Sequence, residues 1–294
     1  MSNYRILSVD GGGMCGVIPL RFMQLLRLDD VSDFDMLVGT STGGIIVVGL
    51  ASGLTVGDIK DFYYSHGPMI FHRCFWRRVF DPWALRNPLY RGENLKKALK
   101  ACFPNKGNNR FVDVKPKVMV PAYDYQKTQP YFFKSWHSEA ISIRALDVCM
   151  ATAAAPTYFE AYGRFVDGGL FANNPALCAV IEAVKLGVRL ENIEVISLGT
   201  GKPVINTKDN KGSGLIGWAT EVMTATLSAS VDVVHHLLTN LPLAKYDRFD
   251  VPKLPIKFAR MDDARHEVLR YRELMADLNF SASERTCLWL RQES

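Results

Sequence analysis

The stretch FDMLVGTSTGGIIVVGLA, residues 34–51, combines a strand, a turn and a helix in one short segment. Phe34–Val38 is an apolar run of strand length, and the glycine-rich turn GTSTGG follows it directly. Ile45–Leu50 then continues as an apolar segment that suits a buried helix. The stretch predicts a strand-turn-helix unit of an α/β fold, with a serine at the tip of the turn.

The turn carries the pattern G-x-S-x-G at Gly39, Ser41 and Gly43. In a nucleophile elbow this pattern holds a serine on a strained turn, and the flanking glycines are needed because the chain passes close to itself. A helix that begins at Thr42 or Gly43 points its positive end at the serine oxygen. The short pattern also arises by chance, but the strand before it and the helix after it favour a nucleophilic Ser41.

A similar unit opens the chain, where Tyr4–Val9 forms a β-rich run followed by DGGG and by apolar residues at helical spacing. Further strands are expected at 117–123, 131–134 and 194–198, and helices at 143–154 and 175–186, the last with Asn174 as its N-cap. The region after Gly201 is expected to be mainly helical, with an extended piece near 250–258. Strands that alternate with helices predict a three-layer α/β fold with a mostly parallel central sheet.

The glycine loop of the first unit has two interpretations. Gly11, Gly13 and Gly16 fit the G-x-G-x-x-G fingerprint of dinucleotide-binding proteins. That fingerprint also needs an acidic residue at the end of the second strand, whereas Asp33 and Asp35 lie at the beginning of that strand here. The alternative is an oxyanion hole in which backbone amides of the loop stabilise the charge that develops on an ester carbonyl. The serine at the end of the second strand favours the oxyanion hole.

A third motif follows the segment ATAAAPTYFEAYGRFV, where Asp167 precedes Gly168 and Gly169. With DGGG first, G-x-S-x-G next and D-G-G last, the chain resembles the patatin-like phospholipases over residues 4–200. The resemblance implies a Ser41–Asp167 catalytic dyad without histidine. It also implies an oxyanion loop at Gly11, Gly12 and Gly13, no metal or other cofactor, and hydrolysis of acyl esters in phospholipids or other lipids.

The roles of the remaining glycines follow from the same comparison: Gly39 and Gly43 shape the elbow, and Gly168 and Gly169 shape the turn after Asp167. For Asp167 to take a proton from Ser41, its pKa must be raised by burial. One departure concerns position 15, where members of the family often carry Arg or Lys and this chain carries Cys15. The absence of a cation at position 15 is expected to affect the rate of hydrolysis and the preferred lipid head group more than the class of reaction.

Other assignments stay open at the level of sequence. His235, His236 and His266 come late enough in the chain to complete an ordinary Ser-Asp-His triad. A transacylase would use the same dyad with an acceptor other than water. A nucleotide-binding or lipid-binding module without hydrolysis would keep the fold alone.

Composition bounds these interpretations. With 294 residues, 48% of them hydrophobic and 22% charged, the chain is expected to form one patatin-like domain over residues 1–294 with a large core. No signal peptide or transmembrane helix is expected, because no apolar run approaches the roughly 20 residues that span a bilayer. We therefore expect a cytoplasmic protein.

The positive charge is concentrated in one part of the chain. Residues 60–117 hold 13 Lys and Arg against 4 Asp and Glu. Within this region, residues 71–91 show an aromatic stripe with arginines beside it, which fits either a core-facing helix or peripheral contact with an anionic membrane surface. Nucleic-acid binding is not expected, because no recognised motif accompanies the charge.

Overall fold

The structure is a computed structural model that describes residues 3–72, 87–103, 105, 108–204 and 215–283, with only the backbone described for 215–223 and 282–283. Its central sheet has the strand order β4-β3-β2-β1-β6-β8, and β5 pairs with β3. The strands are β1 (Tyr4–Val9), β2 (Met36–Gly39), β3 (Lys117–Asp124), β4 (Gln129–Lys134), β5 (Phe165–Asp167), β6 (Ile193–Leu198) and β8 (Lys245–Phe249). A separate short pair joins β7 (Pro203–Val204) to β9 (Leu254–Pro255).

The sheet is mostly parallel, as the alternation of strands and helices predicts. β1 runs parallel to β2 and to β6, β2 runs parallel to β3, and β6 runs parallel to β8. Only β4 and β5 are antiparallel, both against β3. Since the parallel strands end on the same edge, the turns after β1, β2 and β6 gather there, which is where open α/β sheets bind ligands.

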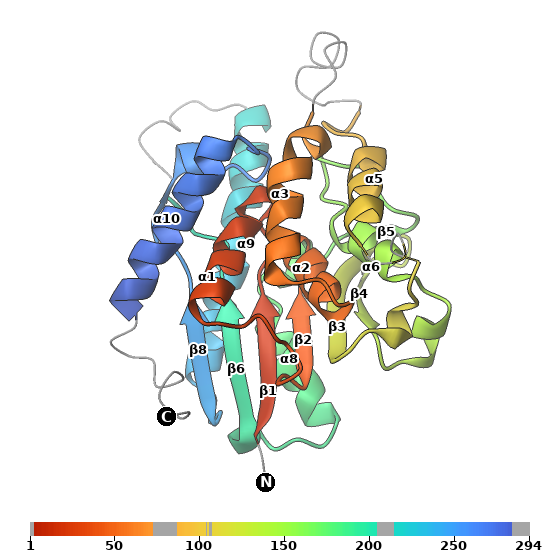
Figure 1. The fold of residues 1–294 in the computed structure, drawn as a ribbon, viewed down its shortest axis with the longest axis vertical. Helices are drawn as coiled ribbons and strands as arrows, with labels where there is room; N and C mark the ends of the chain where they lie inside the picture. The colour runs from red at the N-terminus through yellow and green to blue at the C-terminus, as the bar shows by residue number, and fades with distance from the viewer. Residues whose placement is uncertain (1–2, 73–86, 104, 106–107, 205–214, 284–294) are drawn as a thin grey trace.

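Helices cover both faces of the sheet. On the face seen in Figure 1 lie α1 (Val17–Leu25), α2 (Thr42–Ala51), α3 (Val56–Ile70), α5 (Gly92–Cys102), α6 (Ala145–Thr152) and α10 (His266–Ser283). Behind the sheet lie α7 (Gly169–Ala172), α8 (Ala176–Lys185) and α9 (Leu215–Thr239). Single turns of 3-10 helix occur at Gly13–Gly16, Phe111–Asp113, Ser138–Ile141, Leu190–Asn192 and Ile256–Phe258.

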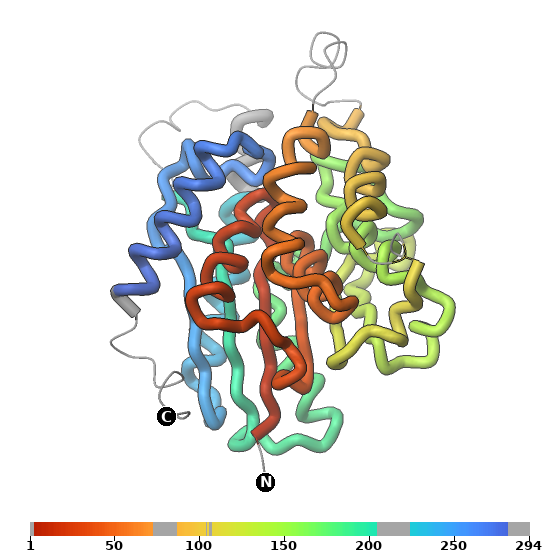
Figure 2. Tube along the Cα trace, viewed as in Figure 1, coloured from red at the N-terminus to blue at the C-terminus, as the bar shows by residue number. Residues whose placement is uncertain are grey.

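Successive side chains of a strand point to opposite faces of the sheet, so the strands contribute to two hydrophobic cores, one on each face. Leu7, Val9 and Leu37 pack toward α1 and α2, whereas Ile6 and Val38 pack toward α8. Because the strands are buried on both faces, they are continuous apolar runs in the sequence. Figure 2 shows β1 in the middle of the sheet, between β2 and β6. The fold class predicted from sequence is confirmed.

The region after Gly201 differs from expectation in one respect. It contributes the two helices α9 and α10, but also β8, which extends the central sheet beside β6. This strand is not expected from the sequence, because KYDRF carries three charged residues and lies at the edge of the sheet, where no continuous apolar run is required.

Two expectations about membranes have different outcomes. Among the described residues, no helix is both long enough and apolar enough to cross a bilayer. Most of the basic aromatic segment at 71–91 falls within residues 73–86, which lie outside the described residues. At its two ends, the rings of Phe71 and Tyr90 lie 5.1 Å apart between centroids, and both pack near Phe159.

Candidate active site

Ser41 occupies a sharp turn between β2 and α2. Its backbone has φ 54° and ψ −119°, a left-handed conformation that a residue with a side chain rarely adopts. A Cβ placed on Gly39 would lie 2.2 Å from the carbonyl oxygen of Gly43, and a Cβ on Gly43 would lie 2.2 Å from that of Val9. Only glycine fits at either position, so the turn that presents Ser41 requires the two glycines of the motif.

Thr152 fixes the backbone of the turn from the end of α6. The amide of Ser41 donates to the Thr152 hydroxyl at 2.9 Å, and this hydroxyl donates to the carbonyl oxygen of Pro121 at 2.7 Å. A Cβ on Gly168 would lie 2.4 Å from that same Pro121 oxygen. Thr152 and Pro121 therefore connect the turn at Ser41 to the turn that follows Asp167.

Asp167 ends β5 and is buried, with 6% of its surface exposed. Its carboxylate accepts a 2.7 Å hydrogen bond from the amide of Gly169. Burial raises the pKa of Asp167 to about 6, and the nearby Ser41 side chain and the Gly169 amide offset part of that rise. A carboxylate with this pKa is ionised at neutral pH and still basic enough to share a proton with a serine hydroxyl.

The glycine loop after β1 is held in place from two sides. The hydroxyl of Thr200, just beyond β6, donates to the carbonyl oxygen of Gly11 at 2.6 Å. The amide of Gly11 donates to the carbonyl oxygen of Asn173 at 3.0 Å. The Gly11 amide, which the sequence predicts as one of the oxyanion donors, is therefore hydrogen-bonded within the protein. The amides of Gly12 and Gly13 donate to no other described residue, and both glycines line the same cavity as Ser41.

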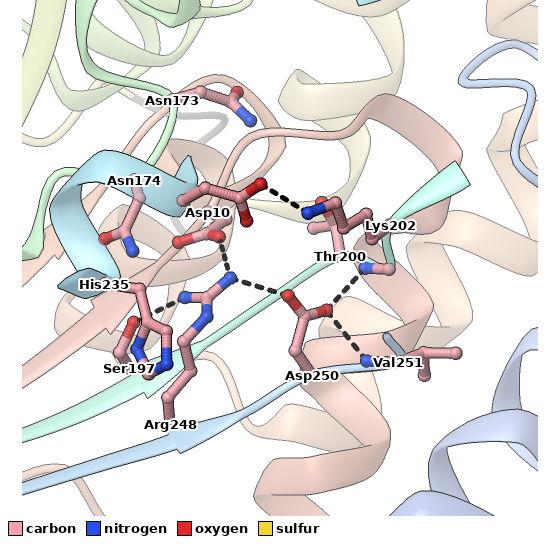
Figure 3. A network of polar contacts seen from close by, with 12 residues as sticks. Asp10, Asn173, Asn174, Ser197, Thr200, Lys202, His235, Arg248, Asp250 and Val251 are labelled. Atoms are coloured by element: carbon pink, nitrogen blue, oxygen red, sulfur yellow. Dashed lines mark hydrogen bonds and ion pairs between the residues drawn. The ribbon is translucent and has the colours of Figure 1, made fainter. Parts of the chain in front are cut away.

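A buried ionic network lies beneath the loop (Figure 3). Arg248, on β8, donates at 2.7 Å to both Asp10 and Asp250 and at 2.8 Å to Ser197. Asp250 accepts from the amides of Gly201 and Val251 at 2.9 and 2.8 Å. Because Asp10 immediately precedes the glycine loop, this network fixes the start of the loop to β6 and β8.

The cavity at Ser41 has an apolar interior and measures about 800 Å³ with its open mouth included. Ser41, Asp167, Gly12 and Gly13 lie in its wall, and the rest of the wall is largely apolar, for example Ile45, Phe62, Ile70 and Leu227. A cavity of this kind suits an aliphatic chain with one polar reacting group.

None of the six histidines, all of which are described, lines this cavity. His235 lies near Arg248 in Figure 3, and its Nδ1 is 2.9 Å from the Tyr246 hydroxyl. Nε2 of His266 is 3.2 Å from the carbonyl oxygen of Tyr64. His236 is exposed on α9. A triad through His235, His236 or His266 therefore finds no support in the arrangement of the site.

The acidic residues considered for ribose binding also lie elsewhere. Asp35 accepts from the amide of Arg5, and Asp33 is 3.9 Å from the Arg5 guanidinium. Both contacts are at the amino end of β1, opposite the glycine loop. The dinucleotide interpretation thus lacks the carboxylate that it needs at the carboxyl edge.

Cys15 packs away from the cavity. Its side chain is buried, its sulfur lies 3.8 Å from the carbonyl oxygen of Ala259, and burial raises the pKa of its thiol. Next to it, the fully buried Arg272 of α10 donates to the carbonyl oxygens of Met14, Phe258, Arg260 and Asp263. Position 15 therefore carries no cation in this chain. Arg272 of α10 instead supplies a cation nearby, which binds the backbone of the 3-10 turn at Gly13–Gly16 through the Met14 carbonyl oxygen.

Comparison with known proteins identifies the family of the chain. Residues 7–180 match the family described as Patatin-like phospholipase. The chain belongs to this family. Within the patatin-like phospholipases, it is 30% identical to patatin-like protein 3 of Arabidopsis thaliana, over 79% of this chain and 68% of that protein. It is 28% identical to a cGAMP-activated phospholipase of Escherichia coli (strain TW11681), over 67% of this chain and 62% of that protein. The crystal structure of VipD from Legionella pneumophila is also similar, with a TM-score of 0.43 and 11% identity over 95% of this chain and 67% of that one.

Sequence reasoning missed several residues that hold this patatin-like site together, namely Thr152, Asn173, Thr200 and Arg248. One signal was available for Thr200. Thr200 lies in the sequence GTG directly after β6. Ligands bind at the carboxyl ends of the strands of an open α/β sheet, so the turn after β6 is as good a candidate as the turns after β1 and β2. No pattern marks Arg248, which meets Asp10 across 238 positions of sequence only because β8 joins the sheet.

Proposed function

We propose that this chain is a serine lipid acyl hydrolase in which Ser41 is the nucleophile and Asp167 its base. The observation that carries the proposal is that Ser41 and Asp167, a buried carboxylate whose pKa burial raises to about 6, lie in the wall of the same apolar cavity. Family membership supports a lipid as the substrate class.

In the first step the Ser41 oxygen attacks the ester carbonyl carbon while Asp167 takes the hydroxyl proton. The carbonyl oxygen becomes an oxyanion, and the amides of Gly12 and Gly13 are available to bind it. When the intermediate collapses, Asp167 returns the proton to the leaving alcohol and the acyl group stays on Ser41. Water then attacks the acyl carbon while Asp167 accepts a proton from it. The bond to the Ser41 oxygen breaks, Asp167 returns the proton to that oxygen, and the fatty acid leaves.

The helix dipole and the strained turn assist this chemistry. The amino end of α2 lies at Ser41, so its partial positive charge favours alkoxide character on the serine oxygen. Because the Ser41 amide donates to Thr152, it is not free to bind the oxyanion, which leaves that role to the glycine loop.

A fluorophosphonate probe tests the nucleophile directly. We expect the probe to label the protein at Ser41, and phospholipid vesicles to release fatty acid. Both signals should be lost in Ser41→Ala and retained in the matched control Ser142→Ala, whose hydroxyl is exposed and donates to the carbonyl oxygen of Glu139. Labelling at another residue, or none in folded protein, would refute the assignment.

Activation by a cyclic dinucleotide is a second proposal, supported by the similarity to phospholipases that are named as cGAMP-activated. The vesicle assay should therefore be run with and without cGAMP. An increase in fatty acid release on addition of cGAMP supports regulation of this kind, and equal rates in an active enzyme contradict it. The same assay with an added alcohol distinguishes a hydrolase from a transacylase by the product that forms.

A further inference from the structure

A second cavity adjoins the one at Ser41. It measures about 440 Å³ with its mouth included and lies between α5, the end of α6 and the segment 159–162. Leu95, Ala153 and Phe159 line both cavities, so these three residues form a common wall. No other described residue is shared between the two linings.

The first cavity contains both the reacting serine and this wall. Ser41 and Asp167 line it together with Leu95 and Phe159. An acyl chain whose ester carbonyl is held at Ser41 has to extend into the apolar interior, because transfer of its methylene groups from water is favourable there. The length of chain that fits is then limited by what closes the interior.

Of the three wall residues, Phe159 is the one whose side chain can be removed with least effect on the core. Leu95 is buried on the inner face of α5, and Ala153 has almost no side chain to remove. Phe159 is only partly buried, and its ring lies 5.8 and 6.0 Å from the rings of Phe71 and Tyr90. It is also the largest of the three.

The space behind the wall is compatible with an apolar chain. Its floor is formed by Met150, Ala153 and Ala154, which are buried. The acidic residues in its lining, Glu93 and Glu160, are exposed, so their carboxylates remain hydrated at the mouth. A Cβ added at Gly92 would make only ordinary van der Waals contacts, at 3.7 Å to Glu160 and 3.9 Å to Met150, so this side of the lining is not tightly packed.

We propose that Phe159 closes the acyl-binding cavity and limits the chain length of the substrate, and that the second cavity is the space into which longer chains extend once the wall is opened. The proposal rests on the proposed acyl hydrolase function. It assigns a specificity-determining role to a residue outside the three sequence motifs.

The test compares hydrolysis of esters with acyl chains from eight to twenty carbons by the wild type and by Phe159→Ala. We expect kcat/KM for the longest chains, relative to the shortest, to rise about tenfold or more in Phe159→Ala. Phe132→Ala is the matched control, because Phe132 is also partly buried but lines neither cavity, and it should leave the chain-length profile unchanged.

A second substitution tests where the longer chain goes. Ala161 is exposed and lines only the second cavity, so Ala161→Phe fills that cavity from the surface. In the double variant Phe159→Ala/Ala161→Phe, the gain for long chains should disappear. Parallel profiles for the wild type and Phe159→Ala, or a gain that survives in the double variant, would overturn the proposal.

Binding measurements separate this proposal from the proposed reaction. Affinities of fatty acids of increasing length can be measured with Ser41→Ala and with Ser41→Ala/Phe159→Ala by displacement of a fluorescent fatty acid. If the double variant prefers longer fatty acids, Phe159 limits the chain length, even if no esterase activity is found. If the dependence of affinity on length is unchanged, Phe159 does not limit it, even if Ser41 proves to be the nucleophile.

Discussion

The backbone amide of Ser41 donates a 2.9 Å hydrogen bond to the hydroxyl of Thr152, which is fully buried at the end of α6. The partner of this amide is thus a side chain 111 positions away in sequence. The same hydroxyl donates to Pro121 on β3. A strained turn persists only where its surroundings hold it, and Thr152 is a major part of those surroundings.

Replacement of Thr152 by valine, which has nearly the same shape, should therefore weaken the turn. We expect the free energy of unfolding to fall by about 1–3 kcal/mol, because the Ser41 amide and the Pro121 carbonyl lose their buried partner. We expect kcat to fall by about 10- to 100-fold, because Ser41 is no longer held in position. Chemical denaturation and ester hydrolysis measure the two effects. Thr152→Ser keeps the hydroxyl and should retain most of the activity; equal losses in both variants would contradict this account.

The pH dependence of kcat/KM should report the ionisation of Asp167. The base is active only when ionised, and its pKa is raised to about 6. With an uncharged ester as substrate, we expect activity to fall about tenfold per pH unit below this value and to reach a plateau above it. Asp167→Asn should abolish the activity. If the acidic limb were instead lost in a His235→Ala/His236→Ala variant that remained folded, a histidine would be the base.

Burial of Asp167 should also lower the stability of the fold at pH values where the carboxyl group is ionised. The folded pKa of about 6 lies above the ordinary value of 3.8, so the contribution of this carboxyl to stability is fully present below pH 3.8 and is lost as the pH rises through 6. Asparagine does not titrate. We therefore expect Asp167→Asn to become more stable relative to wild type as the pH rises from 4 to 7, by up to about 3 kcal/mol. Urea denaturation at several pH values measures the difference, and a constant difference across this range would contradict the raised pKa.

How far the sequence predicts this structure depends on the range of the interactions. β1 begins and ends at the residues expected, because its bounds depend on local pattern. The helix α8 begins one residue later than expected, with Pro175 in place of Asn174 as its N-cap, although the Asn174 side chain still accepts from the amide of Ala176 at 3.0 Å. β8 and its Arg248 depend on a pairing between distant segments, and a polar edge strand carries no local signal for it. At the site, the motifs predict Ser41 and Asp167, which line one cavity, but the engagement of the Gly11 amide by Asn173 is visible only in three dimensions.

Gly12 should tolerate no side chain. A Cβ there would lie 2.4 Å from the Thr200 oxygen that binds the Gly11 carbonyl, so an alanine must displace either Thr200 or the loop. We expect Gly12→Ala to lower kcat by about 10²- to 10³-fold, the loss seen when an oxyanion donor is removed, with little change in KM. Gly57→Ala is the matched control, since its Cβ would meet only the Thr55 hydroxyl oxygen at 3.5 Å. Full activity in Gly12→Ala would mean that the loop does not bind the oxyanion.

Removal of the buried Arg248 should cost far more stability than removal of an exposed arginine that is also paired with a carboxylate. The side chain of Arg248 is 7% exposed and is bonded to Asp10 and Asp250, so Arg248→Met leaves two carboxylates without their counter-charge. We expect a loss of about 3–5 kcal/mol in unfolding free energy and a lower kcat, since Asp10 leads into the glycine loop that we propose binds the oxyanion.

Two further variants show whether charge is the cause. Arg110→Met removes an arginine that is 59% exposed and paired with Asp113, and it should change stability by less than about 1 kcal/mol. Asp10→Asn combined with Arg248→Met removes one of the unpaired charges and should recover part of the loss, which a double-mutant cycle measures. If the double variant were as unstable as the sum of the single variants, the two residues would not act as a pair and the network in Figure 3 would have only a packing role.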